Sequence, residues 1–363
     1  MVVMGTRPEA IKLAPVVLEL RKHAEIDPVV VATAQHRDML DQVLSHFSIE
    51  PDVDLDLMIP NQTLFHVTGE AIRKFETVFH KYSPELILVQ GDTTTSFVGA
   101  LAGFYEKIKI GHIEAGLRTG NKYSPFPEEI NRKLVSVLAD YHFAPTQRNR
   151  ENLIREGTDP AKIVVTGNTV IDALFLTVDH QFTSELLSSR SFERFILVTA
   201  HRRENFGKPL EDICKAIRQM ASTHPEWLFA YPVHPNKNVR EPAYRLLDPI
   251  SNVCLLDPLD YSSFINLMAR ADLILTDSGG VQEEAPSLGK PVLVLREETE
   301  RPEAAEAGTV KVIGTGKKTI VAETEKLIRD KKAYDKMARA HNPYGDGRAS
   351  ERIVAFIKNA RMP

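Results

Sequence analysis

The chain has 363 residues, with 45 basic and 49 acidic side chains and a formal net charge of -4. This length exceeds that of one ordinary domain and predicts two domains, each with its own hydrophobic core. The near balance of charge excludes a general attraction for nucleic acid or for an anionic membrane, so any anion site must be local. We see neither a signal peptide nor an apolar run approaching the ~20 residues that span a bilayer, and we expect a cytoplasmic protein.

The residue types that hold metals are not grouped in the sequence. Cys214 and Cys254 are the only cysteines and have no CxxC spacing, so neither a disulfide framework nor a zinc site is predicted. The acids of DVDLD, at residues 52–56, alternate with apolar residues. This pattern favours the solvent-facing side of a strand over a metal-binding DxD motif, and we therefore predict no metal.

The first half of the chain alternates strand-like apolar runs with helical patterns. The opening strand leads into GTRPEAIKLAP, and further strand-like runs occupy residues 28–34, 85–90, 108–113, 141–146 and 162–168. Segments such as RDMLDQVLSHF and TSFVGALAGFYEK, which have helical patterning, lie between them. This alternation is typical of a parallel sheet with helices on both faces.

The second half repeats the same alternation. Its strand-like runs occupy residues 195–200, 227–233, 252–256, 272–276 and 291–295. We therefore predict an α/β protein with two Rossmann-like, doubly wound domains in tandem. The first domain is expected to span residues 1–172 and the second residues 173–342, and the polar, strandless stretch 180–193 is the expected connection.

The segment GTRPEAIKLAP places several charged residues at the first helix start. Thr6 and Glu9 have the spacing of a capping box, and Pro8 lies in the first turn, where proline is tolerated. Helix capping does not explain Arg7 and Lys12, which either contact a phosphate at the helix start or form a solvated basic face. Because the spacing lacks GxGxxG, NAD is not expected.

Acidic residues follow two strands of the first half. Asp92 comes directly after one strand-like run and Glu114 after the next, which brings both to the carboxyl edge of a parallel sheet, where ligands bind. Glu128 lies at a helix start in PFPEEINR. Three neighbouring acids can act as general acid and general base. Crowding and burial give their carboxyl groups different pKa values, so that one can accept a proton while another donates one. Helix capping by Asp92 and dipole matching by Glu128 are the structural alternatives.

Basic residues occupy the matching edge of the second half. His201, Arg202 and Arg203 follow the strand-like run 195–200, and His234 follows the next strand. A histidine at such an edge is suited to binding an anion or to protonating a leaving group, although a lone histidine is more often structural. Farther along, Phe264 or Tyr261 is a candidate for stacking on a base, and core packing explains either equally well.

The segment LILTDSGGVQEEAPSLGKPVLVL predicts a strand, a tight corner, a helix over residues 281–288 and a second strand. Gly279 and Gly280 permit a turn that leaves backbone N–H groups free at the helix start, which attracts phosphate. A carboxylate there does not assist by charge, so we expect one of Glu283 and Glu284 to accept hydrogen bonds from ribose hydroxyls. An ordinary helix start with acids matching the dipole is the alternative.

Motifs throughout the chain carry a family resemblance: GTRPEAIKLAP, AQHRDMLDQV, GDTTTS, HIEAGLRTG, PFPEEINR, TGNTVIDAL, HRREN, TDSGGVQEEAPSLGKPVLVLR, TERPEA and HNPYGDG. Together they resemble the bacterial non-hydrolysing UDP-N-acetylglucosamine 2-epimerases. The resemblance implies a glycosyltransferase-B-like fold with two Rossmann-like domains facing a cleft. It also implies a C-terminal helix, at about residues 343–363, that packs on the first domain, and a homodimer.

The resemblance also implies roles for individual residues. It places the diphosphate of UDP at Ser278, Gly279 and Gly280, the ribose at Glu284, and uracil at Phe264 and the Leu259 backbone. The residues around the diphosphate would be Arg7, Lys12, His201 and Arg301, with His201 also counted among the catalytic residues. The catalytic acids would be Asp92, Glu114 and Glu128. A second, regulatory substrate molecule would contact Gln35, Arg202 and His234.

The implied reaction removes the proton at sugar C2 while UDP leaves C1, and then adds both back with C2 inverted. It interconverts UDP-N-acetylglucosamine and UDP-N-acetylmannosamine, needs no redox cofactor and feeds cell-surface polysaccharide precursors. A glycosyltransferase of the same fold is the main alternative, but it has no need of three acids in the first domain. A hydrolysing epimerase and a non-catalytic nucleotide-sugar sensor are further alternatives.

Overall fold

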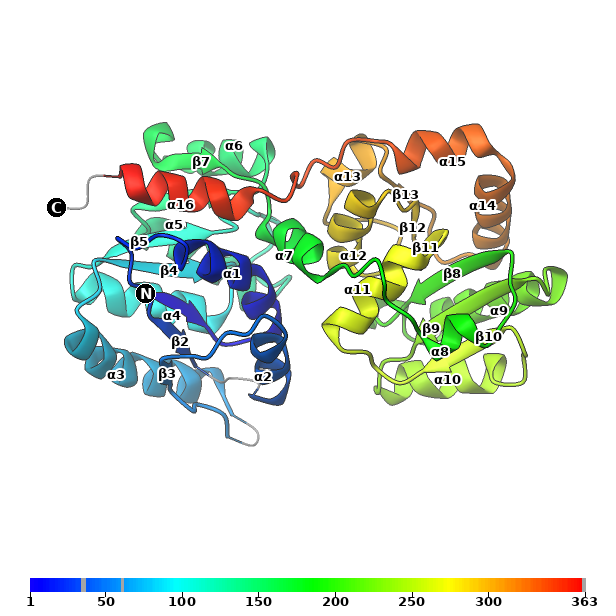
Figure 1. The fold of residues 1–363 in the computed structure, drawn as a ribbon, viewed down its shortest axis with the longest axis horizontal. Coiled ribbons are helices and arrows are strands. Elements are labelled where there is room, and N and C mark those ends of the chain that lie inside the picture. The colour runs from blue at the N-terminus through cyan, green and yellow to red at the C-terminus, as the bar shows by residue number, and fades with distance from the viewer. Residues whose placement is uncertain (34–36, 60–61, 361–363) are drawn as a thin grey trace. The chain divides into compact units, whose positions relative to one another are not determined.

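The computed structural model describes residues 1–33, 37–59 and 62–360. The chain forms two compact units (Figure 1). Unit 1 comprises Met1–Leu176 and Tyr344–Pro363, and unit 2 comprises Thr177–Pro343. Each unit is an α/β structure built on one parallel sheet. Within the described ranges, no helix combines the length and apolar character needed to cross a bilayer.

The sheet of unit 1 has seven parallel strands in the order β3-β2-β1-β4-β5-β6-β7. Their bounds are β1 (Val2–Met4), β2 (Val30–Ala32), β3 (Val53–Asp54), β4 (Leu86–Gln90), β5 (Lys109–Ile113), β6 (Tyr141–Ala144) and β7 (Ile163–Val165). Valine, isoleucine and leucine dominate the central strands, which helices cover on both faces, and β1 and β4 are fully buried. The order reverses between β1 and β4, and this switch point is where such sheets bind ligands.

The helices of unit 1 connect successive strands. They are α1 (Arg7–Leu20), α2 (Arg37–His46), α3 (Leu64–Tyr82), α4 (Thr94–Tyr105), α5 (Glu128–Leu138), α6 (Gln147–Arg155), α7 (Thr169–Thr177), a 3-10 turn η1 (Pro160–Lys162) and α16 (Ala349–Asn359). The helices α1, α3, α4 and α6 each begin after a threonine whose hydroxyl accepts a hydrogen bond from the N–H three residues on. These caps satisfy N–H groups that have no partner within the helix.

The C-terminal helix α16 packs on α1 of unit 1. Asp172 in α7 caps it across 177 residues of sequence, because its carboxylate accepts hydrogen bonds from Ala349 N at 3.1 Å and Ser350 N at 2.8 Å. The Ser350 hydroxyl donates to the same carboxylate. Phe356 packs edge-on against Tyr141 and Phe143 of β6. Helix α16 is therefore part of the core of unit 1.

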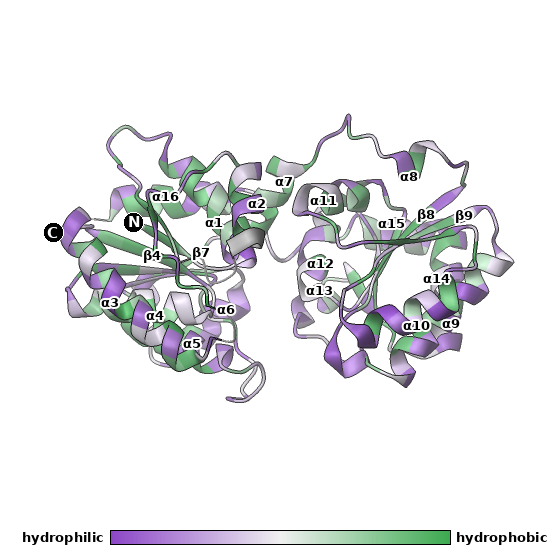
Figure 2. Ribbon diagram, turned by 90° about the horizontal axis from the view of Figure 1, so that it is seen from below, coloured by the Kyte–Doolittle hydropathy of each residue, from purple (hydrophilic) through white to green (hydrophobic). Residues whose placement is uncertain are grey.

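The sheet of unit 2 has six parallel strands in the order β10-β9-β8-β11-β12-β13. They are β8 (Arg194–Thr199), β9 (Trp227–Pro232), β10 (Val253–Leu256), β11 (Leu273–Thr276), β12 (Val292–Val294) and β13 (Val310–Val312). Figure 2 shows the apolar character of β8 and β9. The switch point lies between β8 and β11, where Thr199 is in register with Thr276 and their hydroxyls are 2.5 Å apart. This strand order is that of the Rossmann fold, and the predicted fold class is confirmed.

One helix of unit 2, α12 (Gly279–Glu284), begins at the predicted phosphate corner. The helices of this unit are α8 (Glu185–Ser188), α9 (Lys208–Thr223), α10 (Lys237–Leu247), α11 (Tyr261–Arg270), α12, α13 (Pro302–Glu306), α14 (Lys317–Arg329) and α15 (Lys331–Ala338), with 3-10 turns η2 (Arg203–Asn205) and η3 (Ala285–Leu288). The single helix predicted over residues 281–288 is therefore wrong in detail. It begins two residues earlier, at Gly279, and its second half tightens into η3 before Gly289, which has φ +67°.

The edge strand β13 of unit 2 was not predicted. It is three residues long, and its central Lys311 is exposed. It therefore lacks the continuous apolar run that marks the other strands of this sheet.

Candidate functional site

Two acids lie at the carboxyl edge of the first sheet. Asp92 follows β4 by two residues and Glu114 follows β5 directly, and the last residues of these strands, Gln90 and Ile113, are in register. Burial raises the pKa of Asp92, a shift that Arg132 opposes and the charge of Glu114 reinforces. The two carboxylates are therefore electrostatically coupled neighbours, and a raised carboxyl pKa suits a group that exchanges protons near neutral pH.

The Glu114 carboxylate is held by side chains from three other elements. Lys12 Nζ of α1 lies 2.6 Å from Oε1 and 2.7 Å from Oε2, and Asn168 Nδ2 donates to Oε1 at 3.0 Å. Gln90 at the end of β4 donates to Oε2. The backbone of Glu114 has φ +63°, a conformation that non-glycine residues rarely adopt. A residue keeps such a strained backbone conformation only where surrounding contacts hold it there, and such residues are common at functional sites.

The Asp92 carboxylate is bound by helix α5. Arg132 Nε donates to Asp92 Oδ2 at 2.8 Å, and Arg132 also pairs with Glu129 at 3.0 Å. Asn131 Nδ2 donates to the Asp92 carbonyl oxygen at 2.9 Å. Glu128 begins the same helix and is half-buried, and its buried Oε2 has no hydrogen-bond partner. The start of α5 is therefore fixed against the Asp92 loop.

The capping-box prediction for α1 is only half right. The Thr6 hydroxyl does accept from Glu9 N, but the Glu9 carboxylate accepts from Gly5 N at 3.0 Å rather than from Thr6 N. Its other oxygen accepts from the hydroxyls of Thr93, at 2.6 Å, and Ser96, at 2.9 Å. Burial raises the pKa of this carboxyl. Glu9 thus joins the loop before α1 to the start of α4.

Arg7 and Lys12 were both candidates for phosphate contact at the start of α1. Lys12 lies against Glu114 in this structure, as described above. Arg7 is the first residue of α1 and is half-buried.

A buried histidine supports the Asp92 loop and was missed by the sequence analysis. His112 Nε2 lies 2.7 Å from the carbonyl oxygen of Gly91, the turn residue with φ +70° that precedes Asp92. Burial lowers the pKa of His112 to about 3, so the ring is neutral, and Nε2 must carry its hydrogen to donate to that carbonyl. His112 also lies two residues before Glu114, and it therefore connects the loops that carry the two acids.

The candidate nucleotide corner lies at the carboxyl end of β11 in unit 2. A Cβ atom on Gly279 would meet Arg202 Nη2 at 3.6 Å and Arg301 Nη2 at 3.7 Å, so two guanidinium groups flank this glycine. Arg301 is held by an ion pair with Glu283. Since α12 is too short to bind an anion by its dipole alone, the arginines supply most of the positive charge at the corner.

Glu284 lies on the other side of the same corner. The Tyr261 hydroxyl donates to Glu284 Oε1 at 3.1 Å. A Cβ on Gly280 would lie 3.7 Å from Glu284 Oε2 and 4.0 Å from Ser278 Oγ, so Ser278, Gly280 and Glu284 form one cluster. Tyr261 is buried, and its hydroxyl orients the Glu284 carboxylate. This role explains Tyr261 better than stacking on a base.

The other nucleotide candidates lie on nearby elements. Leu259 and Phe264 are both half-buried, Leu259 just before α11 and Phe264 within it. His201 and His234 follow β8 and β9, and their rings stack with centroids 5.7 Å apart and an interplanar angle of 18°. Burial lowers the pKa of His201. Gln35 lies outside the described residues.

Asp277 was not among the predicted site residues, but it organises this edge. It is fully buried, and its Oδ2 accepts hydrogen bonds from His201 N and Arg202 N, each at 2.8 Å, and from Asn205 Nδ2 at 2.9 Å. The Asp277 carboxylate therefore fixes the loop after β8 against the start of α12. Its position between the predicted strand and Ser278 was the only sequence signal for it.

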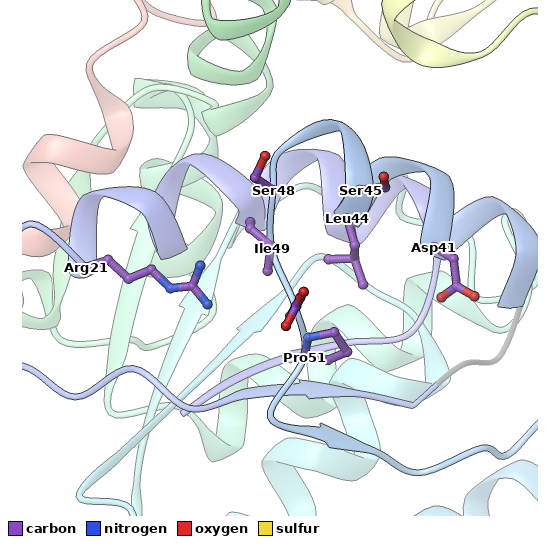
Figure 3. Close-up of a pocket in the computed structure, with 8 residues that line it drawn as sticks. Arg21, Asp41, Leu44, Ser45, Ser48, Ile49 and Pro51 are labelled. Carbon is purple, nitrogen blue, oxygen red and sulfur yellow. The ribbon is translucent and has the colours of Figure 1, made fainter.

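One surface hollow of unit 1 is lined by other residues than these. It has a volume of about 640 Å³. Its lining residues are Arg21, side chains of α2 and residues 48–51 (Figure 3). It lies where α1 and α2 end, at the opposite edge of the sheet from Asp92 and Glu114. No group of three or more histidine, cysteine, aspartate and glutamate side chains within the described residues has the arrangement of a metal site.

Comparison with known proteins agrees with the resemblance of the motifs. The model of the UDP-N-acetylglucosamine 2-epimerase family matches residues 18–358. The chain belongs to this family. Among curated members, the UDP-N-acetylglucosamine 2-epimerase of Escherichia coli strain K12 is 52% identical over 99% of this chain and 98% of the relative. That of Bacillus subtilis strain 168 is 53% identical over 98% of this chain and 93% of the relative.

Solved structures of UDP-N-acetylglucosamine 2-epimerases have the same fold as this chain. The Neisseria meningitidis enzyme, bound to UDP-GlcNAc, is 49% identical with a TM-score of 0.89 over 99% of both chains. A Staphylococcus aureus protein solved with UDP is 52% identical with a TM-score of 0.89, covering 99% of this chain and 95% of that one. The predicted membership of an isomerase family is confirmed.

Proposed function

We propose that this protein interconverts UDP-N-acetylglucosamine and UDP-N-acetylmannosamine by inverting C2 of the sugar. The proposal rests on one observation: in a chain of this family, both parallel sheets carry suitable side chains at the carboxyl ends of their strands, where such sheets bind ligands. One edge bears the coupled acids Asp92 and Glu114, and the other bears a Ser-Gly-Gly corner flanked by two arginines. An acid/base group and an anion site are the two things that this reaction needs.

We propose that unit 2 holds the UDP part of the substrate. Ser278, Gly279 and Gly280 would contact the diphosphate together with His201 and Arg301. The resemblance also placed Arg7 and Lys12 there, but Lys12 is held against Glu114, and we propose that it acts mainly through that carboxylate. Glu284 would accept hydrogen bonds from the ribose, and its orientation by Tyr261 supports this role. Phe264 and the Leu259 backbone would contact uracil.

The resemblance assigned Gln35, Arg202 and His234 to a second, regulatory substrate molecule. The position of Arg202 beside Gly279 supports a direct role at the diphosphate instead, since its Nη2 would be 3.6 Å from a Cβ on that glycine. Regulation at Gln35 and His234 stays a proposal.

We propose an elimination and re-addition mechanism. The C1–O bond breaks and its electron pair leaves with UDP, while the C2–H electron pair forms the C1=C2 double bond of 2-acetamidoglucal. The C2 proton passes to one of the carboxylates Asp92, Glu114 and Glu128. In re-addition, a proton is delivered to the opposite face of C2 and an oxygen of UDP bonds again to C1. Because the C2 proton is barely acidic, cleavage of C1–O leads, and positive charges stabilise the departing UDP. The sequence of steps involves no net oxidation.

We also propose the setting in which the reaction occurs. The two units would act as the domains predicted at residues 1–172 and 173–342. The enzyme would act in the cytoplasm and supply UDP-N-acetylmannosamine for cell-surface polysaccharide precursors.

A homodimer is the proposed assembly, and unit 1 offers a surface for it. Helices α3, α4 and α5 pack side by side (Figure 2), and they expose large apolar side chains. These are Phe65, Phe104, Tyr105, Ile130, Leu134 and Val137. Exposed apolar groups on neighbouring helices are typical of a subunit interface. A second copy of the chain is the proposed occupant, and a Val137→Glu variant is expected to sediment as a monomer.

A product assay tests the proposed activity. The purified protein is incubated with UDP-N-acetylglucosamine alone, and proton NMR follows the anomeric signals. Appearance of UDP-N-acetylmannosamine, and the reverse conversion from that compound, supports the epimerase. Free N-acetylmannosamine would indicate a hydrolysing enzyme, sugar transfer to an added acceptor would indicate a glycosyltransferase, and unchanged substrate with bound UDP would indicate a sensor.

A further inference from the structure

The two oxygens of the Asp277 carboxylate, at the end of β11, have different surroundings. Oδ2 accepts three hydrogen bonds, from two backbone N–H groups and the Asn205 amide. Oδ1 is buried and has no hydrogen-bond partner. Leaving a buried carboxylate oxygen without a hydrogen bond costs free energy, so a nearby donor is expected to be drawn to it.

The basic side chain that faces this oxygen is that of His201. Its Nδ1 lies 3.7 Å from Asp277 Oδ1, slightly beyond hydrogen-bond range, and a small movement of the ring would close the gap. The two residues follow adjacent strands, β8 and β11, which are in register at Thr199 and Thr276. The His201 side chain is 38% exposed, so part of the ring is accessible to a ligand.

The charged groups around His201 define its state before a ligand binds. Burial, Arg202 and His234 all lower the pKa of His201, and Asp277 opposes them. The imidazole is therefore neutral near pH 7, and its tautomer decides which nitrogen can take up a proton. A neutral ring that donates from Nδ1 to Asp277 leaves the Nε2 lone pair available for that proton.

We infer that Asp277 is a positioning residue that makes His201 bind diphosphate together with a proton. Asp277 Oδ1 accepts a hydrogen bond from His201 Nδ1–H, and Nε2 takes up a proton from water and then donates it as a hydrogen bond to the diphosphate. The inference rests on the proposed function, because it requires the diphosphate to bind beside His201. A carboxylate that orients and stabilises an imidazolium in this way follows the general logic of aspartate–histidine pairs.

This arrangement has a consequence for the elimination step. UDP gains negative charge as the C1–O bond breaks, and an imidazolium held by Asp277 would stabilise it at the start of bond cleavage. The proton remains on His201 throughout, so no additional reactant is consumed. Uptake of a proton on binding is thus the measurable signature of the pair.

A matched pair of variants tests this inference. Asp277→Asn is nearly isosteric, since its amide oxygen can accept the three N–H groups that Oδ2 accepts. Its NH2 group would face Nδ1 and donate to it, which reverses the hydrogen bond and opposes the imidazolium. His201→Gln removes the titrating ring and serves as the reference variant.

The measurement is calorimetric titration of the full-length protein with UDP in buffers of different ionisation enthalpy. At about pH 8 the terminal phosphate of UDP is already ionised, so proton uptake reports the protein. The parent is expected to take up about 0.3 to 1 proton per UDP, and Asp277→Asn close to none, with roughly 10-fold weaker binding. The same proton uptake in Asp277→Asn as in the parent, with uptake lost in His201→Gln, would overturn the role of Asp277.

Two other results of these experiments would have separate meanings. If His201→Gln binds UDP like the parent and takes up the same proton, His201 is not at the diphosphate, and both the inference and that part of the proposed site are wrong. If Asp277→Asn does not fold, nitrogen-15 NMR of the UDP-free parent reports the tautomer directly, with the His201 signals assigned from His201→Gln. Hydrogen on Nδ1 supports the inference, and hydrogen on Nε2 overturns it.

Discussion

Lys12 Nζ lies 2.6 Å from Glu114 Oε1, which joins the first helix of the chain to the end of β5. Both side chains are largely buried, at 17% and 9% exposed. In such a setting, removing one charged partner costs more free energy than the pair itself contributes. The ammonium group therefore holds the Glu114 carboxylate in place, and Glu114 depends on it for any role in proton transfer.

We expect Lys12→Met to lower turnover by roughly 100-fold, as for loss of an acid/base group, because the Glu114 carboxylate would lose the cation that positions it. UDP affinity, measured by calorimetry, should change much less if Lys12 acts mainly through Glu114. Lys22→Met is the matched control, because Lys22 just beyond the same helix pairs with Glu19 at the surface. A large loss of UDP affinity with little change in kcat would instead assign Lys12 to the diphosphate.

Gly279 offers a test of the nucleotide corner that leaves the charges in place. A Cβ there would make only ordinary contacts, at 3.6 Å and 3.7 Å, with the two arginines, so Gly279→Ala should fold and melt like the parent. The added methyl group would occupy space that a phosphate needs and should weaken UDP binding by about 10-fold or more. Gly69→Ala in α3 is the control, since nothing lies within 4 Å of its Cβ position. Parental UDP affinity in Gly279→Ala would remove this corner from the site.

His112 makes a prediction about the pH dependence of stability. Burial lowers its pKa to about 3, below the ordinary value of 6.5, so the unfolded chain binds more protons than the folded chain between these values. The stabilisation from neutral His112 is therefore fully present above about pH 6.5 and is lost progressively as the pH falls toward 3. His142, which is in register with His112 and has a pKa lowered to about 4, adds in the same direction.

Urea unfolding of His112→Gln checks this sign. The variant should lose less stability than the parent between about pH 6.5 and about pH 4, because glutamine does not titrate. The glutamine amide can still donate to Gly91 O, so its turnover should exceed that of His112→Leu, which cannot. Equal pH slopes for parent and variant would show that His112 does not titrate as described.

Most strands were predictable because their signal is local. Runs such as residues 273–276 are continuously apolar, end in turn residues and alternate with helical segments, which is the pattern of a doubly wound sheet. The edge strand β13 was missed, since its three residues include an exposed lysine. The split of the predicted helix 281–288 into α12 and η3 was also missed, as tightening of a last turn depends on packing rather than on periodicity.

The candidate site was also predictable only in part. Acids after strands and the Ser-Gly-Gly corner are visible because strand ends converge at one sheet edge. Asp277 also follows a strand directly, but it was missed because its role depends on contacts with residues far away in the sequence. His112 lies within a strand, where nothing local distinguishes it from an ordinary core residue. Glu9 was assigned to a capping box on spacing alone, whereas its carboxylate is bonded across to α4.

The central claim is that a carboxylate of this protein removes the C2 hydrogen of the sugar and that the hydrogen is replaced from solvent. Incubation with UDP-N-acetylglucosamine in heavy water, followed by mass spectrometry and proton NMR, tests it most directly. The account predicts deuterium at C2 of the UDP-N-acetylmannosamine formed, and loss of this exchange in Asp92→Asn or Glu114→Gln variants that still bind UDP. Epimerised product that retains its original C2 hydrogen would contradict it.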